Sequence, residues 1–266
     1  MEGIMRRNIL REKLNNNEST ISTHIHSVWP SVVEAIGHAH IYDYVEFVAE
    51  YGPSDLHDLD NLARAADIYD LGMMLKVDQS NQAYLAQRGI GSGFGSILFT
   101  DARNVDDVKE CIRIATPDTP EDGGLYGVST RRNSYMGYGG SEDYIKSVRD
   151  VVIAIMIEKQ GAVDHLEEIL SLPNVDMIQW GPSDYSMNTG KGGQRNHPDV
   201  IKTRNFVFKK ALEMGVAPRA EINSVDEAKE YLDMGVKHFS IGTDINILHN
   251  WWKQNGEALA KAIDES

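Results

Sequence analysis

The sequence predicts an α/β protein folded as one closed (β/α)8 barrel, the TIM-barrel fold. Short β-rich runs alternate with longer stretches of helical spacing, which implies parallel strands joined by helical crossovers. Eight such runs occur in the 266 residues. That number in this length suits a closed barrel, usually about 250 residues long, better than an open doubly wound sheet. We therefore predict a single barrel domain over residues 1–266.

The predicted strands follow a polar N-terminal segment. Each is a short run rich in β-branched or other large apolar residues, and polar or glycine-containing segments separate it from the next. They span residues 20–26, 44–49, 73–77, 95–99, 151–158, 175–181, 216–222 and 237–243.

Helices are predicted between the strands. Residues 54–69 carry leucine and alanine at helical spacing along one face, and residues 224–235 begin at a capping Ser224 and end at Gly235. The glycine-rich segment 89–96 leads into a strand instead of following one, so it does not match a dinucleotide-binding loop. We interpret it as a tight turn.

The longest irregular segment covers about residues 116–140 and is dense in Gly, Pro, Ser and Asn. A segment of this length without regular structure is usually a functional loop or a linker. Because it falls between the fourth and fifth strands, we predict a long active-site loop and no domain boundary.

Composition narrows the class of partner. The formal net charge of −14 argues against binding to nucleic acid or to an anionic membrane. No apolar run reaches the roughly 18 residues of a membrane span, and the N-terminus lacks the apolar core of a signal peptide. The single cysteine, Cys111, lies in a helical pattern and is expected to be structural. We expect a cytoplasmic protein that binds small molecules.

Acidic side chains dominate the strand ends, where a barrel enzyme gathers its reactive groups. Glu158 closes the fifth predicted strand, and Asp184 follows the sixth in "VDMIQWGPSD". Two carboxylates held close in a partly dry pocket repel each other unless a proton or a cation lies between them. Oxygen ligands with open water positions suit Mg²⁺ or Mn²⁺. The spacing thus favours a divalent-metal site.

The segment "IMIEKQGAVDHLEEILSLPNVDMIQWGPSDYSMNTG" resembles the metal-binding half of the HpcH/HpaI aldolases. These are class II pyruvate aldolases with a barrel of the phosphoenolpyruvate/pyruvate-binding type, related to macrophomate synthase and to citrate lyase β-type barrels. Their metal-binding Glu and Asp have the same separation of 26 residues as Glu158 and Asp184. The resemblance implies that these two carboxylates ligate Mg²⁺ or Mn²⁺, with Co²⁺ also possible. It further implies that backbone groups of Gly181, Pro182 and Ser183 help to hold a 2-oxo acid.

This chain departs from the family pattern at four other positions. The family has a Glu-His pair after the second strand, and here Glu50 is kept while Tyr51 takes the place of the histidine. The third strand of the family ends in an arginine that grips the substrate, and Lys76 stands there. Lysine keeps the charge but loses the bidentate fork. Met156 and Tyr126 replace a family glutamine and arginine. We infer an altered substrate or proton route, with the metal retained.

Several candidates have two interpretations. Lys76 either contacts substrate or extends outward along apolar surface, and Tyr51 is either a proton donor or a packing group. Arg219 either supplies the missing grip on a carboxylate or forms an ion pair with Glu221 or Asp244. His24 and His26 share one face of the first strand, which suits a pocket or a second metal. In the alternative, one of the two lines the pocket and the other is satisfied by hydrogen bonds.

The resemblance implies cleavage or formation of a C–C bond next to a 2-oxo acid. A 4-hydroxy-2-oxo acid would give pyruvate or an analogue plus an aldehyde, through an enolate that the metal stabilises. With Tyr51 in the histidine's place, we assign the general base to a water molecule that Glu50 holds at the metal. The family also suggests a homo-oligomer, a hexamer built as a trimer of dimers. Alternatives are another enolate-forming lyase or decarboxylase, a hydrolase or isomerase of sugar acids, and a catalytically silent binding barrel.

Overall fold

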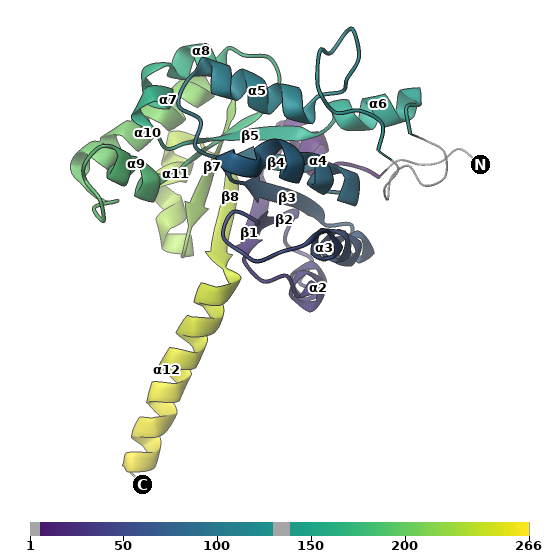
Figure 1. Cartoon of the computed structure of the whole chain (residues 1–266). Helices are drawn as coiled ribbons and strands as arrows, with labels where there is room; N and C mark the ends of the chain where they lie inside the picture. The colour runs from purple at the N-terminus through teal and green to yellow at the C-terminus, as the bar shows by residue number, and fades with distance from the viewer. Residues whose placement is uncertain (1–5, 130–138, 266) are drawn as a thin grey trace.

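The computed structural model describes residues 6–129 and 139–265 and confirms the closed barrel. Eight parallel strands close in sequence order, each hydrogen-bonded to the next and the eighth to the first (Figure 1). Every predicted strand lies within two residues of its expected bounds. The strands are β1 (Thr20–Ile25), β2 (Tyr44–Val48), β3 (Gly72–Val77), β4 (Ser96–Phe99), β5 (Val152–Ile157), β6 (Met177–Trp180), β7 (Ala217–Ile222) and β8 (His238–Thr243).

Helices pack around most of the barrel, and α1 precedes the first strand in the sequence (Figure 1). They are α1 (Ile9–Asn15), α2 (Pro30–His38), α3 (Leu56–Ile68), α4 (Gln82–Ser92), α5 (Val105–Ala115), α6 (Glu142–Arg149), α7 (Gln160–Asp164), α8 (Leu166–Leu170), α9 (Pro182–Asn188), α10 (Pro198–Glu213), α11 (Ala228–Met234) and α12 (Asp244–Asp264), with 3-10 turns η1 (Gln79–Asn81) and η2 (Val225–Glu227).

The ends of two predicted helices show how local sequence sets the boundaries. Asp55 forms a capping box at the start of α3 and accepts hydrogen bonds from the backbone N–H groups of His57 and Asp58. Gly235 ends α11 with φ of 95°, a conformation that favours glycine. Ser224 precedes η2, without a capping hydrogen bond from its side chain.

The glycine-rich segment is only partly a turn, which corrects the sequence-based interpretation. Residues 89–92 form the last turn of α4, and the chain turns at Gly93, whose φ is 114°. Gly89 lets the helix approach the barrel closely, because a Cβ there would lie 2.4 Å from Cδ2 of Leu75 on β3. Close helix-to-strand packing, and not turn formation, explains that glycine.

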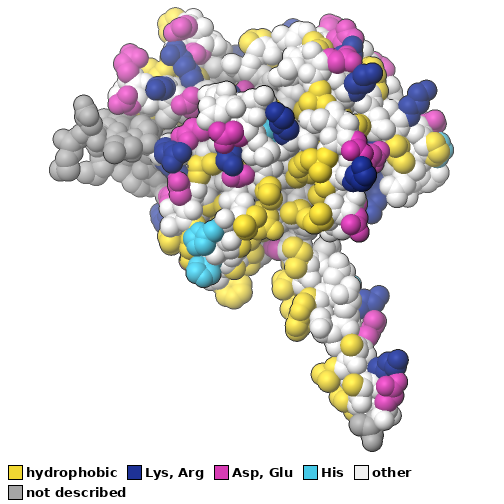
Figure 2. All heavy atoms as spheres, turned by 180° about the vertical axis from the view of Figure 1, so that it is seen from behind, with side chains coloured by type: hydrophobic (Ala, Val, Ile, Leu, Met, Phe, Trp, Pro, Cys, Tyr) yellow, Lys and Arg dark blue, Asp and Glu magenta, His cyan; other side chains and the backbone are white. Residues whose placement is uncertain are grey.

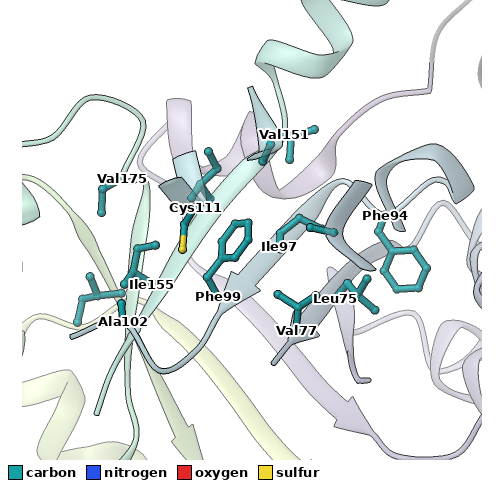
Figure 3. Close-up of a cluster of buried hydrophobic side chains, with 14 of the residues drawn as sticks. Leu75, Val77, Phe94, Ile97, Phe99, Ala102, Cys111, Val151, Ile155 and Val175 are labelled. Atoms are coloured by element: carbon teal, nitrogen blue, oxygen red, sulfur yellow. The ribbon is translucent and has the colours of Figure 1, made fainter. Parts of the chain in front are cut away.

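Apolar side chains form two separate groups because alternate residues of each strand face opposite sides. Residues such as Phe47, Leu75 and Ile155 point outward and pack under the helices, as Figure 3 shows for the region of β3–β5. Cys111 is buried there, and burial raises the pKa of its thiol to about 12. The inward group fills the lower barrel, with Leu10 of α1 packed among Tyr44, Met74, Leu98, Val152, Ala154, Met156 and Met177.

The described part of the 116–140 segment lies at the opposite end of the barrel from the expected active site. A small cavity of about 60 Å³ brings Tyr126 and Ser129 beside Gly72, the first residue of β3. The physical reason is the order of elements: the segment follows helix α5, which runs back to the N-terminal ends of the strands. Residues 130–138 of the predicted loop lie outside the described residues.

The last helix, α12, does not pack along the barrel as the other helices do (Figure 1). It begins at the end of β8 and projects away from the body of the molecule. Figure 2 shows apolar side chains along this helix and on the barrel face beside its start. None of the helices in the described ranges is long and apolar enough to cross a membrane.

Candidate active site

The C-terminal ends of the strands open into a cavity of about 750 Å³. Eight of the ten predicted site residues line it: His24, Tyr51, Lys76, Glu158, Gly181, Pro182, Ser183 and Asp184. Their strands bring them together because inward-facing positions recur at every second residue. Lys76 lies two residues after the inward-facing Met74, and Glu158 lies two residues after the inward-facing Met156. The residues above the apolar lower barrel therefore face the cavity.

The two carboxylates of the predicted metal site face this cavity in an electrostatically unfavourable arrangement. Glu158 is buried, whereas Asp184 is partly exposed in the first turn of α9. Burial, with a further contribution from the charge of Asp184, raises the pKa of Glu158 to about 7. A divalent cation between the two carboxylates would remove this conflict.

Glycine at position 181 makes room for the Glu158 carboxylate. A Cβ at this position would lie 2.5 Å from Oε2 and 2.7 Å from Cβ of Glu158. The backbone φ of Gly181 is −105°, which other residues also adopt, so the requirement is for space. Pro182 then occupies the first turn of α9 without needing an N–H partner.

The residues present fit a divalent metal bound by few protein groups. Within residues 6–129 and 139–265, no group of three or more His, Cys, Asp and Glu side chains could hold a metal ion. With Glu158 and Asp184 as its protein ligands, substrate and water would complete the octahedral coordination that Mg²⁺ prefers.

We expect Gly181→Ala to weaken metal binding and turnover about a hundredfold by displacing the Glu158 carboxylate, an effect of the size seen for a misplaced catalytic group. Gly192→Ala is the control, because nothing lies within 4 Å of its added Cβ. Calorimetric Mn²⁺ titration and steady-state kinetics measure the two variants. Equal affinities for both would contradict the steric account.

Lys76 places a positive charge inside the cavity. Its Nζ lies 2.6 Å from Oε2 of Glu50 and 3.4 Å from the hydroxyl of Tyr51. Burial alone would lower the pKa of Lys76, but the charges of Glu46 and Glu50 outweigh it and raise that pKa. The side chain is therefore a cation at neutral pH, and it lines the cavity instead of extending outward.

Tyr51 and Glu50 flank this lysine from the end of β2. Tyr51 is 60% exposed, and Nζ of Lys76 lies 4.8 Å from its ring centroid. Burial of its hydroxyl raises the pKa of Tyr51, because the opposing effect of Lys76 is smaller. A tyrosine in this setting donates a hydrogen bond but is a poor base. Glu50 is not among the described residues that line the cavity. It forms an ion pair with Lys76, which does line it.

His24 forms the opposite wall with residues of β7 and β8. Its Nε2 is hydrogen-bonded to the hydroxyl of Thr243 and lies 3.7 Å from Oε1 of Glu221. His26 lines the cavity as well, so both histidines face it. Burial and the neighbouring His24 lower the pKa of His26.

Arg219 is not at a strand end, which corrects the sequence-based placement. It is the third residue of β7, is fully buried inside the barrel and is not among the described residues that line the cavity. It forms an ion pair with Glu46 and donates hydrogen bonds to the side-chain oxygens of Gln179 and Ser22. The expected pairing with Glu221 or Asp244 is thus replaced by Glu46, whose carboxylate lines the floor of the cavity.

Sequence reasoning missed this buried network. Burial alone would raise the pKa of Glu46, but the charge of Arg219 outweighs it and lowers that pKa. A signal was present: Glu46 and Gln179 interrupt otherwise apolar strands, and Arg219 lies within the predicted seventh strand. Charged residues at inward positions need a partner across the barrel, because an unpaired buried charge is very costly.

Sequence comparison places this geometry in a known family. The model of the HpcH/HpaI aldolase/citrate lyase family matches residues 27–250. The chain belongs to this family. It is accordingly an enzyme of the carbon–carbon lyase type, from a family whose aldolases act on 2-oxo acids.

Named relatives cover nearly the whole chain. A 5-keto-4-deoxy-D-glucarate aldolase of Enterobacter sp. (strain 638) is 26% identical over 87% of this chain and 89% of its own length. A hydroxypyruvate/pyruvate aldolase of Paraburkholderia phytofirmans is 24% identical over 90% of this chain and 92% of its own. The crystal structure of a family protein from Burkholderia cenocepacia superposes with a TM-score of 0.86 at 25% identity, over 96% of this chain and all of that chain.

Proposed function

We propose that this protein is a divalent-metal-dependent class II aldolase that cleaves or forms the C3–C4 bond of a 4-hydroxy-2-oxo acid. The products of cleavage are pyruvate, or a close analogue, and an aldehyde. One observation carries the proposal: Glu158, Asp184 and the cationic Lys76 face a single cavity at the C-terminal end of the barrel.

In this proposal, Glu158 and Asp184 hold Mg²⁺, Mn²⁺ or Co²⁺. Such an ion, when bound, supplies Lewis-acid stabilisation of negative charge on the oxygens of the 2-oxo acid. Lys76 binds the carboxylate or the developing oxyanion of the substrate, where a fixed cation in a partly dry site acts strongly. The backbone of Gly181, Pro182 and Ser183 bounds the 2-oxo acid on the other side.

Proton transfer falls to Glu50 in this proposal. In the cleavage direction, a water molecule held by Glu50 takes the proton of the 4-hydroxyl group and passes one of its own protons to the Glu50 carboxylate. The electron pair of the C3–C4 bond moves onto the pyruvate fragment as the bond breaks and the aldehyde forms, and C3 then takes up the proton that Glu50 returns through the same water. Tyr51 donates a hydrogen bond, in keeping with its raised pKa.

The outer wall of the cavity suits a polar aldehyde. Arg195, Asn196, Asn223 and Asn246 line it, and His24 with Glu221 lies at its inner edge. These groups can bind hydroxyl or carboxylate substituents of a sugar-acid-derived aldehyde. The name of one relative, the 5-keto-4-deoxy-D-glucarate aldolase, gives a keto sugar acid as its substrate.

Metal-dependent exchange of the pyruvate methyl protons with deuterated solvent tests this function without knowledge of the aldehyde. We expect exchange with Mn²⁺ or Mg²⁺ present and none in excess EDTA, as followed by proton NMR. Exchange that persists in EDTA would contradict the proposal. Metal binding without exchange would favour the binding-barrel alternative, and release of CO₂ from an oxaloacetate-like acid would favour a decarboxylase.

We also propose that the protein is a homo-oligomer in which α12 packs on a second copy. The apolar residues Ile245, Leu248, Trp252, Leu259 and Ile263 follow helical spacing and are 41–64% exposed. Ile21 on the outer face of β1 is also 41% exposed, because none of the helices that the structure describes covers the β8–β1 side of the barrel. Exchange of α12 between two copies would cover both surfaces.

We expect Trp252→Asp to convert the oligomer to a smaller species in sedimentation velocity at micromolar concentration, because a charge would enter the apolar interface. Gln254→Asp adds the same charge nearly on the opposite side of α12 and is the control. A monomeric wild-type protein, or an unchanged Trp252→Asp assembly, would contradict this packing.

A further inference from the structure

Both proposed metal ligands are linked to the segment that follows β4. The backbone N–H of Asp101 donates a hydrogen bond to Oε1 of Glu158 at 2.8 Å. The carboxylate of Asp101 lies 2.7 Å from Nζ of Lys159, and this ammonium also donates to Oδ1 of Asp184 at 3.0 Å. One residue is thereby linked to both carboxylates, directly to the first and through Lys159 to the second.

The geometry of this connection depends on an uncommon backbone conformation. Asp101 has φ of 60°, in the left-handed region that non-glycine residues rarely adopt. Such conformations persist where the surroundings hold them and are concentrated at functional sites. Here this conformation accompanies the N–H contact with Glu158 and the carboxylate contact with Lys159.

Packing holds the partner segment in place. The Lys159 side chain is only 6% exposed, although it follows directly after Glu158 at the end of β5. The start of α7 packs tightly on the segment that follows β4, since a Cβ on Gly161 would lie 2.3 Å from the carbonyl oxygen of Arg103. The lysine has little freedom to leave its two carboxylates.

The charges of this group match a divalent cation. Asp101 and Lys159 neutralise each other at the shorter of the two contacts, so Lys159 adds little net repulsion toward a metal at Asp184. The two carboxylates that remain carry a charge of about −2 once both are ionised. Because Lys159 contacts Oδ1 of Asp184, it can fix the carboxylate with Oδ2 available to the metal.

We infer that Asp101 and Lys159 are positioning residues that orient Glu158 and Asp184 for binding a divalent cation. The inference rests on the proposed metal site and adds the groups that hold its ligands. Outer groups of this kind orient metal ligands, and their removal typically weakens metal affinity about 10- to 100-fold.

The test is Mn²⁺ titration of the full-length protein at pH 8, with free Mn²⁺ followed by electron paramagnetic resonance. We expect Lys159→Met to weaken the affinity about 10- to 100-fold and Lys159→Arg to restore most of it, because the cation is kept. Asp101→Gly keeps the backbone conformation and the N–H contact but loses the carboxylate, and it should weaken affinity by a similar factor. The double variant should bind Mn²⁺ no more weakly than the single variant with the lower affinity, because both changes break the same connection.

Lys109→Met is the matched control, because Lys109 forms a similar 2.9 Å pair with Asp106 on the surface of α5. Asp101→Asn preserves side-chain size and serves as a second variant if Asp101→Gly unfolds, with far-ultraviolet circular dichroism as the check. Equal or tighter Mn²⁺ binding by Lys159→Met would overturn the inference and identify Lys159 as a competitor of the metal. A wild-type protein that binds no Mn²⁺ would overturn the proposed metal site as well.

Discussion

Glu158→Gln is expected to abolish Mn²⁺ binding and to lower the rate of pyruvate proton exchange at least about a thousandfold. The substitution keeps the shape of the side chain but removes the charge that binds the cation. Lewis-acid stabilisation by a metal contributes several kcal/mol, and about 1.4 kcal/mol corresponds to a factor of ten in rate. Asp184→Asn should have the same effect. Calorimetric titration and proton NMR measure the two quantities.

The fold should survive this change, and stability provides a check on the electrostatic argument. The pKa of Glu158 is raised to about 7, mainly by burial, so its ionised form opposes folding of the metal-free protein above that pH. We therefore expect metal-free Glu158→Gln to be at least as stable as the wild type at pH 8, as measured by urea unfolding. Retained Mn²⁺ binding by the variant would exclude Glu158 as a ligand.

Lys76→Met is expected to lower kcat/KM for the 2-oxo acid about 100- to 1,000-fold, the range for removal of one fixed group that stabilises an oxyanion. A fall in kcat together with a rise in KM would indicate that Lys76 holds charge that grows in the transition state. Lys76→Arg should recover part of the activity, because it retains the cation. Steady-state kinetics of pyruvate exchange measure all three proteins.

Tyr51→Phe is the comparison for Lys76, because it removes only the hydroxyl that lies 3.4 Å from Nζ. We expect a loss of less than about tenfold, since removal of a true general base costs about 100-fold or more. A larger loss with the metal still bound would assign the proton transfer to Tyr51. Unchanged kinetics for Lys76→Met would exclude that lysine from substrate binding.

The strands, and the position of Glu158 and Asp184 at the cavity, could be predicted from the sequence because both depend on local pattern. Apolar runs of strand length, separated by helical spacing, predicted all eight strands, as the closed barrel confirms. Side chains alternate between the two faces of β3 and β5. Lys76 and Glu158 therefore face the same side as the inward-facing Met74 and Met156, which lie two residues before them. A period of two is a property of the single strand, so it needs no knowledge of what lies across the barrel.

Tertiary structure decided every feature that depends on a partner distant in the sequence. The sequence predicts Arg219 at a strand end, either as a grip on a substrate carboxylate or paired with a nearby acid, but barrel closure brings Glu46 of β2 within its reach and buries both. Segment 116–140 follows a helix, so its described part lies at the face opposite the cavity. Lys159 contacts Asp101 only because β4 and β5 are neighbours. The sequence by itself determined the barrel and the place of Glu158 and Asp184 at its open end. Closure of the barrel decided which charged side chains pair. Ion pairing depends on distance in space, and long-range contacts leave no periodic pattern in the sequence.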